Sequence, residues 1–232
     1  MKKVGTMYVS AEKIKQRKKR FKNAKKLALI ILLALGLLYV VLALIFNGGD
    51  FSIRLQDNLF DHGIVIYERE DDFDFRRRLF AEPLDFMDNI SIHWLPENLG
   101  DLDGSHNGDN FIAHTFYIEN KGNRRVNYWK EIIIDNVTRN VDESIRIMII
   151  PTGGEREVYA KLNSRTGLPE PDTIPFRDDA KIIIRQRRNF TPGTIDRYTV
   201  VIWLEGDDPD TTDELIGGQI RMHMMITGEF LD

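Results

Sequence analysis

The segment 101–110 has the residue types and the spacing of a calcium-binding loop. It reads DLDGSHNGDN, which places oxygen-bearing side chains at alternate positions and includes two glycines that permit tight turns. Ca²⁺ is bound by several such oxygen ligands in loops of this kind. The predicted ligands are Asp101, Asp103, Ser105, Asn107 and Asp109. The alternative is an ordinary surface turn, because Asp, Asn and Gly are also the common turn residues.

The match to an EF-hand is limited to the first half of such a loop. The twelfth position counted from Asp103 is His114, where an EF-hand carries a bidentate glutamate. No flanking helices are predicted. A second acidic segment is a weaker candidate for the same ion, and its carboxylates are Glu205, Asp207, Asp208, Asp210, Asp213 and Glu214.

Sequence patterns of covalent, nucleotide or zinc chemistry are missing from this chain. It has no cysteine, and it contains no nucleophile-elbow, phosphate-loop, dinucleotide or zinc-protease motif. His114 and His223 would approach each other if their strands paired, and the alternative is two separately hydrogen-bonded histidines. Carboxylate pairs such as Glu170 with Asp172 are too frequent to single out a catalytic pair. We therefore expect a protein that is not an enzyme, and the alternative is an envelope hydrolase using carboxylates or Ca²⁺.

Aromatic side chains are a further candidate for ligand binding. Trp94, Tyr128, Trp129 and Trp203 could form a platform on which sugar rings stack. Aromatic residues also supply much of the buried area of a sandwich core. Because Trp129 and Trp203 lie in the middle of apolar runs, we expect core positions for both.

An uncharged segment near the start of the chain predicts where these residues are held. Residues 27–46 read LALIILLALGLLYVVLALIF, and a helix of about 20 apolar residues is long enough to cross a bilayer. The 26 residues before it contain eleven Lys and Arg and one acid, and such basic flanks stay in the cytoplasm. We predict a basic cytoplasmic tail over 1–26, a transmembrane helix over 27–46 and an extracytoplasmic domain over 47–232.

A cleaved signal peptide is the alternative reading of this segment. The apolar run is longer than the core of a typical signal peptide, and no small-x-small cleavage pattern follows it. These two details favour an uncleaved anchor in the cell membrane.

The charge of the chain is divided unevenly. Residues 27–232 carry 21 basic and 35 acidic groups, although the whole chain has a net charge of only -4. An acidic surface repels nucleic acid, so we expect no nucleic-acid partner. The lack of cysteine in an exported domain favours the exterior of a Gram-positive bacterium over an oxidising compartment.

After residue 50 the apolar pattern has a period of two, as in β-strands. Val, Ile, Thr and aromatic residues form short runs separated by Gly, Asn, Asp and Pro. The predicted strands are 51–56, 64–68, 90–94, 111–119, 126–136, 144–150, 157–160, 181–186, 196–205 and 219–227. Many short strands with turn signals between them predict an all-β fold, an antiparallel β-sandwich of jelly-roll or Ig-like type.

Local patterns also predict how the strands connect. Turn residues at 120–123, 152–154 and 191–193 are expected to close three hairpins, and 211–216 is expected to contain one helical turn. Strand 111–119 is apolar on both faces, which indicates a central strand.

Segments 108–122, 198–205 and 217–227 carry a resemblance. A Gly-Asp turn, a strand that ends in Asn-x-Gly and a closing strand after a long acidic loop resemble the TasA/camelysin group of Gram-positive cell-surface and biofilm-fibre proteins. The resemblance implies a secreted β-sandwich. Members of that group typically have a cleaved signal peptide, whereas 27–46 reads as retained, and no zinc motif accompanies the peptidase label of the group.

These observations predict a membrane-anchored cell-surface protein whose acidic β-sandwich is a non-catalytic interaction module. Its expected partners are membrane lipid around the anchor and an envelope protein or polysaccharide. Ca²⁺ is the cofactor that the loop at 101–109 allows. A second alternative is a matrix or fibre subunit that polymerises through an edge strand such as 51–56.

Overall fold

The computed structural model describes residues 11–46, 51–72 and 74–231. The chain divides into two compact units, Met1–Gly48 and Gly49–Asp232. We describe each unit separately.

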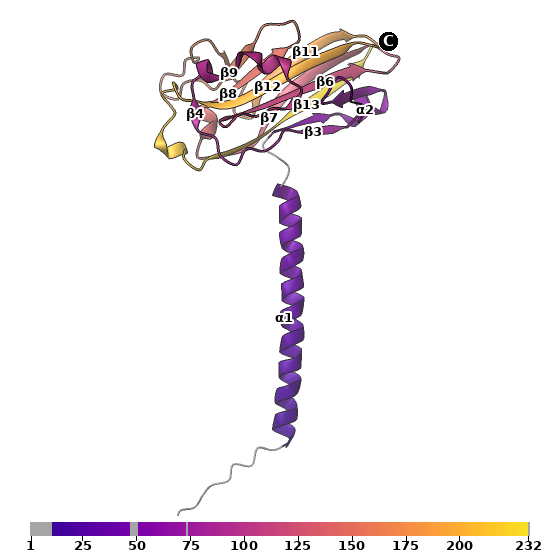
Figure 1. Cartoon of the computed structure of the whole chain (residues 1–232), viewed down its shortest axis with the longest axis vertical. Coiled ribbons are helices and arrows are strands. Elements are labelled where there is room, and N and C mark those ends of the chain that lie inside the picture. Colours follow the sequence, from indigo (N-terminus) through magenta and orange to yellow (C-terminus); the bar gives the residue numbers. More distant parts are fainter. Residues whose placement is uncertain (1–10, 47–50, 73, 232) are drawn as a thin grey trace, which may run out of the picture. The chain divides into compact units, whose positions relative to one another are not determined.

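The first unit is the single helix α1 (Ala11–Phe46), which is 36 residues long (Figure 1). Its described apolar side chains, from Leu27 to Val40, are exposed. The helix is long and apolar enough to cross a membrane, as predicted, although a signal sequence would have the same properties. It begins well before residue 27, because the Lys- and Arg-rich segment 11–26 consists largely of good helix formers.

The second unit contains two β-sheets (Figure 1). The five-stranded sheet has the order β11 (Lys181–Phe190), β7 (Val126–Thr138), β13 (Gln219–Phe230), β1 (Phe51–Leu55), β3 (Arg78–Phe80). The main path of the eight-stranded sheet is β10 (Ile174–Pro175), β9 (Glu157–Ala160), β8 (Ile145–Pro151), β12 (Ile195–Glu205), β6 (Phe111–Asn120), β2 (Ile64–Tyr67). Off this path, β4 (Asn89–Ile90) pairs with β12 and β5 (Gly104–Ser105) pairs with β6.

Short helical turns join some of these strands. They are α2 (Asp57–Asp61) and the 3₁₀ turns η1 (Ile92–Trp94), η2 (Glu97–Asp101), η3 (Val141–Glu143) and η4 (Asp213–Leu215). The predicted helical turn within 211–216 is therefore confirmed.

The predicted all-β, sandwich-like fold preceded by one helix is confirmed. Most neighbouring strands are antiparallel, as expected. Three pairs are parallel, namely β1 with β13, β9 with β10 and β4 with β12. β1 lies between β13 and β3, so the expectation of an open edge at 51–56 is wrong, because a short strand that the sequence did not reveal covers that edge.

The main core consists of the alternate residues that the sheets bury. Met222, Met224 and Ile226 of β13 are buried in this core. β6 lies between β12 and β2 in its sheet and is buried on both faces, because Ile112 and Phe116 belong to the main core and Phe111 and Ala113 to a second apolar cluster. This confirms the predicted central position of the strand.

Two of the three predicted hairpins are wrong. The turn at 152–154 joins the paired strands β8 and β9, as expected. The turns at 120–123 and 191–193 instead carry the chain from one sheet to the other, since β6 and β12 belong to one sheet and β7 and β11 to the other. The Asn120 amide joins these two crossings, donating to the carbonyls of Arg124 and Phe190, both at 2.9 Å.

The predicted strand 90–94 is also wrong beyond its first residue. β4 ends at Ile90, and Ser91 is the N-cap of the 3₁₀ turn η1 that follows. The backbone amide of Ile92 donates to Glu205 at 3.2 Å, so this segment satisfies its polar backbone through a side chain instead of a strand partner.

Candidate functional site

The predicted calcium loop lies against β6, and its acidic ends do not converge. Asp101 and Asp109 are exposed. Asp103 Oδ1 accepts hydrogen bonds from the Tyr117 hydroxyl at 2.8 Å and from Arg197 Nη2 at 3.0 Å. The Asp103 carboxylate thus already has an arginine as its counter-ion.

Ser105 and Asn107 hold the loop in place. Ser105 Oγ accepts from the backbone amide of Glu82 and contacts His114 Nδ1, both at 2.8 Å. Asn107 donates to the Glu82 carbonyl at 2.9 Å and accepts from the Ala113 amide at 3.0 Å. Within the described ranges, this loop brings no three acidic or histidine ligands together. Calcium binding at the five predicted residues stays a prediction, and each of the three inner residues would first lose a hydrogen bond or ion pair.

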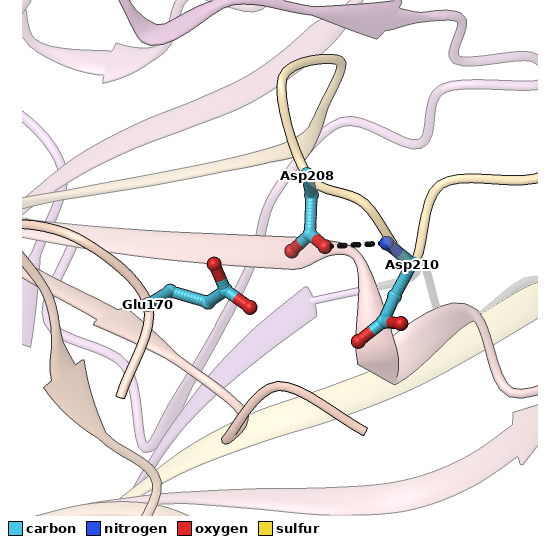
Figure 2. Close-up of side chains that lie close together, drawn as sticks. All are labelled: Glu170, Asp208 and Asp210. Atoms are coloured by element: carbon cyan, nitrogen blue, oxygen red, sulfur yellow. Dashed lines mark hydrogen bonds between the residues drawn. The ribbon is translucent and has the colours of Figure 1, made fainter. Parts of the chain in front are cut away.

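Three other carboxylates do meet (Figure 2). Ligand oxygens of Glu170, Asp208 and Asp210 all lie within 4.8 Å of one another. The three residues are 8%, 5% and 9% exposed. Asp208 and Asp210 come from the acidic loop that the sequence marked as the weaker candidate, and the backbone amide of Asp210 donates to Asp208 Oδ1 at 2.8 Å.

Arg146 of β8 is the built-in cation of this cluster. Its side chain is 4% exposed, its Nη2 donates to Asp208 Oδ2, and the same nitrogen lies 4.0 Å from Glu170 Oε2. The guanidinium is therefore the cationic partner of these buried carboxylates. A metal ion here would have to displace or share the place of Arg146.

Asp210 is tied to the neighbouring loop. Ser164 donates to its carboxylate through the backbone amide at 2.8 Å and through Oγ at 2.7 Å. Burial raises the pKa of Asp210, but the Ser164 hydrogen bonds and the nearby Arg165 and Arg146 guanidinium groups outweigh burial and lower the pKa below its usual value. The cluster therefore joins the 161–173 loop to the 206–212 loop as an ion-paired network.

A second polar cluster, centred on Lys130, lies within the β unit. Lys130 of β7 is 8% exposed, and its Nζ lies 3.3 Å from the centre of the Tyr198 ring. Asp196 accepts from the Tyr128 hydroxyl and, at 3.0 Å, from Arg187 Nε. Burial lowers the pKa of Lys130 to about 7, although Asp196 and Glu157 act in the opposite direction.

A groove lies beside this polar cluster, between β11 and the pair β9 and β10. Its volume is about 450 Å³. Tyr159 of β9, Ile174 and Pro175 of β10 and residues 182–185 of β11 line it, and Arg177 and Asp178 complete the lining. It combines apolar side chains with the edge of a sheet.

The aromatic residues do not form one platform. Trp203 and Tyr128 are fully buried, which confirms the core position expected for Trp203. Trp129 is only half-buried, so the core position expected for it is wrong, because it lies on the face of β7 opposite the buried Tyr128 and Lys130. Trp94 is 74% exposed on η1, and it is the most exposed of these four residues.

The two sheet histidines lie in different sheets and do not meet. His223 Nδ1 pairs with Asp135 Oδ2 at 2.9 Å. His114 pairs with Ser105, and its burial, together with His106, lowers the pKa of His114 to about 4. Each histidine thus has its own hydrogen-bond partner, as the alternative prediction stated.

Comparison with known protein families, with curated proteins and with solved structures finds no match for this chain. The resemblance to the TasA/camelysin group therefore stays a prediction. The geometry of the described residues must carry the functional argument.

Sequence reasoning missed Arg146, Glu170 and Lys130. Glu170 is 38 positions from Asp208 along the chain, and no local pattern relates them. Lys130 lies in an alternating strand where its neighbours Tyr128 and Ile132 are fully buried. That placement of a lysine on a buried face was the one available signal.

Proposed function

We propose that this chain is a membrane-anchored protein of the Gram-positive cell surface whose β unit is a non-catalytic interaction module. The observation that carries the proposal is the groove beside β11, which joins apolar side chains to an unpaired strand edge. Such a surface fits binding of an envelope component better than bond cleavage.

The charge distribution and the helix support the anchored part of this proposal. The apolar part of α1 follows a strongly basic segment, while the β unit is acidic. Basic flanks are retained in the cytoplasm. The N-terminus is then cytoplasmic and the β unit lies outside the cell.

Protease accessibility tests the anchored topology. The full chain, tagged at both ends, is expressed in a Gram-positive host, and protoplasts are treated with a protease. We expect loss of the C-terminal tag, protection of the N-terminal tag and retention of the N-terminal fragment in the membrane after carbonate extraction. A mature protein that begins near Asp50 and is found in the medium contradicts the anchor.

Site-specific photo-crosslinking tests the interaction module. A benzoylphenylalanine replaces Arg177 in the groove, and a matched variant carries it at Arg78 on β3. We expect adducts with an envelope component from position 177 and few from position 78. Equal labelling from both positions contradicts a binding surface at the groove.

A further inference from the structure

β11 is a terminal strand with an unpaired side. It pairs with β7 on one side, and within the described part of the chain no strand pairs with the other side. In an antiparallel pair alternate residues direct their amide and carbonyl groups away from the partner strand. The stretch from Ile183 to Arg187 therefore offers a row of donors and acceptors, which is a template for a further strand.

The groove lies on this unpaired side. β9 and β10 end the opposite sheet, and Tyr159, Ile174 and Pro175 face β11 across the groove (Figure 1 shows β9 and β11). An extended segment added to β11 would lie along the opening between the two sheets. Its alternate side chains would then meet Ile174 and Pro175, which are lining residues that remain partly exposed.

β11 is rich in basic residues, although the β unit as a whole is acidic. β11 carries Lys181, Arg185, Arg187 and Arg188 and no acidic residue. Arg185 is exposed and lies 3.5 Å from Glu157, while Arg188 donates to the neutral amide of Gln186. Lys181 pairs with Glu131 at 2.9 Å and Arg187 with Asp196 at 3.0 Å, so among the described residues Arg188 is the β11 cation without a carboxylate partner.

Arg177, which lines the groove, adds a further cation. It is exposed, and no carboxylate pairs with its guanidinium among the described side chains. Arg177 and Arg188 are therefore available to a negatively charged partner. Both remain solvated, so pairing would require little additional desolvation.

We propose that β11 binds an extended acidic segment of a partner protein by strand addition, with acidic side chains at Arg177 and Arg188 and apolar ones in the groove. This inference rests on the proposed interaction function and identifies its partner class. Only a peptide can supply the backbone groups that the strand edge lacks. A second copy docked through β11 itself would place arginines opposite arginines, and like charges opposite each other are destabilising.

The probe is a fluorescent nine-residue peptide of alternating Glu and Val, and the protein is the full chain in nanodiscs. We expect saturable binding in fluorescence anisotropy and slowed amide exchange at 183–187. A peptide of alternating Lys and Val is the charge control. Equal binding of the Lys peptide overturns the proposal.

Two N-methylated versions of the acidic peptide distinguish strand addition from ion pairing. One carries methyl groups on the odd residues and the other on the even residues, so each lacks the donors of one edge. We expect one version to lose at least tenfold in affinity and the other to bind like the parent. Unchanged binding of both versions overturns strand addition and indicates a general polyanion surface.

Charge reversal on the protein locates the site. Arg177→Glu with Arg188→Glu is expected to weaken binding of the acidic peptide at least tenfold, while Arg78→Glu on β3 leaves it unchanged. Equal effects overturn the assignment to β11. If no peptide binds but crosslinking from position 177 succeeds, this inference is overturned and the proposed function is not. A cleaved protein released into the medium overturns the proposed function instead.

Discussion

Buried ionisable side chains define the polar chemistry of the β unit at the scale of single residues. Arg146 stands among three buried carboxylates, and Lys130 packs on the face of Tyr198. Both cations are nearly inaccessible to water. Their contributions to stability differ, because Arg146 has charged partners at contact distance, whereas Lys130 is held mainly by a ring.

Lys130 predicts a pH dependence of folding. Because its pKa is about 7 when folded and about 10.5 as a model group, the unfolded chain binds more protons between these values. The free energy of unfolding therefore rises with pH above 7, by up to about 1.4 kcal/mol per unit. Lys130→Met should flatten this rise. Urea unfolding at pH 7, 8 and 9, followed by tryptophan fluorescence, measures it.

The control for Lys130 is a lysine outside the buried cluster. Lys121 is a half-exposed residue paired with Glu119 at 3.0 Å, and Lys121→Met should keep the rise seen in the wild type. The pH range ends at 9 because Tyr198 would add its own pH dependence above that value. Burial raises the pKa of Tyr198 to about 12, whereas a tyrosine in the unfolded chain ionises near pH 10. An identical slope in Lys130→Met and the wild type would refute the assignment.

Arg146 predicts a large loss of stability on neutralisation. Arg146→Met leaves Glu170, Asp208 and Asp210 as neighbouring buried carboxylates without their guanidinium, which should reduce the free energy of unfolding by about 3–5 kcal/mol. Ca²⁺ at millimolar concentration should stabilise this variant more than the wild type, because the three carboxylates would then lack their counter-ion. Urea unfolding with and without Ca²⁺ gives both numbers.

Arg165 is the matched control for Arg146. It lies 3.9 Å from Asp210, but its side chain is 67% exposed. Arg165→Met should therefore change the free energy of unfolding by less than about 1 kcal/mol. Equal losses in the two variants would show that the buried network has no special role.

Strand positions at the scale of elements follow largely from local pattern, and their partners do not. Most of the predicted strands begin or end within a few residues of their predicted bounds, because a period of two is a local property. These strands include β1, β2, β6, β7, β8, β9, β12 and β13. The strands β3, β5 and β10 are two or three residues long, too short for any period to show. Turn residues predict that the chain reverses, but they do not predict in which sheet it continues. Two of the predicted hairpins are therefore connections between the two sheets.

The crossing from β6 to β7 predicts the effect of a single methyl group. A Cβ on Gly122 would lie 2.3 Å from the His62 carbonyl oxygen. The backbone cannot retreat freely, because Lys121 N–H donates to the Gly63 carbonyl at 2.8 Å. Gly122→Ala should lower the free energy of unfolding by about 1–3 kcal/mol, as measured by urea unfolding.

Gly206 provides the comparison for Gly122. A Cβ there would lie no closer than 3.6 Å to its neighbours, which is an ordinary contact. Gly206→Ala should leave stability within about 0.5 kcal/mol of the wild type. A Gly122→Ala variant as stable as Gly206→Ala would mean that the crossing tolerates a larger separation of its two turns.

At the scale of the whole molecule, the two units differ in where they carry their apolar side chains. The described apolar side chains of α1 are exposed to solvent, whereas those of the β unit form its core. A run of this length is long enough to cross a membrane, and a signal sequence has the same property. Membrane association should therefore depend on α1 through its apolar character.

Substitution within α1 tests this dependence. Leu32→Arg with Leu35→Arg places two charges near the middle of the apolar run, each costing about 2.5–3.5 kcal/mol on insertion. We expect the double variant to leave the membrane fraction, as followed by carbonate extraction and immunoblotting. The matched variant Leu32→Ile with Leu35→Ile should stay in the membrane. Retention of the arginine variant would contradict a spanning helix.

The sequence alone determined the helix, the all-β class and most strand positions, because hydrophobic period and composition act over a few neighbouring residues. It also placed Asp208 and Asp210 in a candidate acidic loop. Only the tertiary structure decided that Glu170 and Arg146 join them and that β1 is covered by β3. The open basic edge of β11 likewise became visible only in the assembled sheets. These features depend on which distant segments become neighbours, and that is decided by the collective burial of both sheets rather than by any short segment.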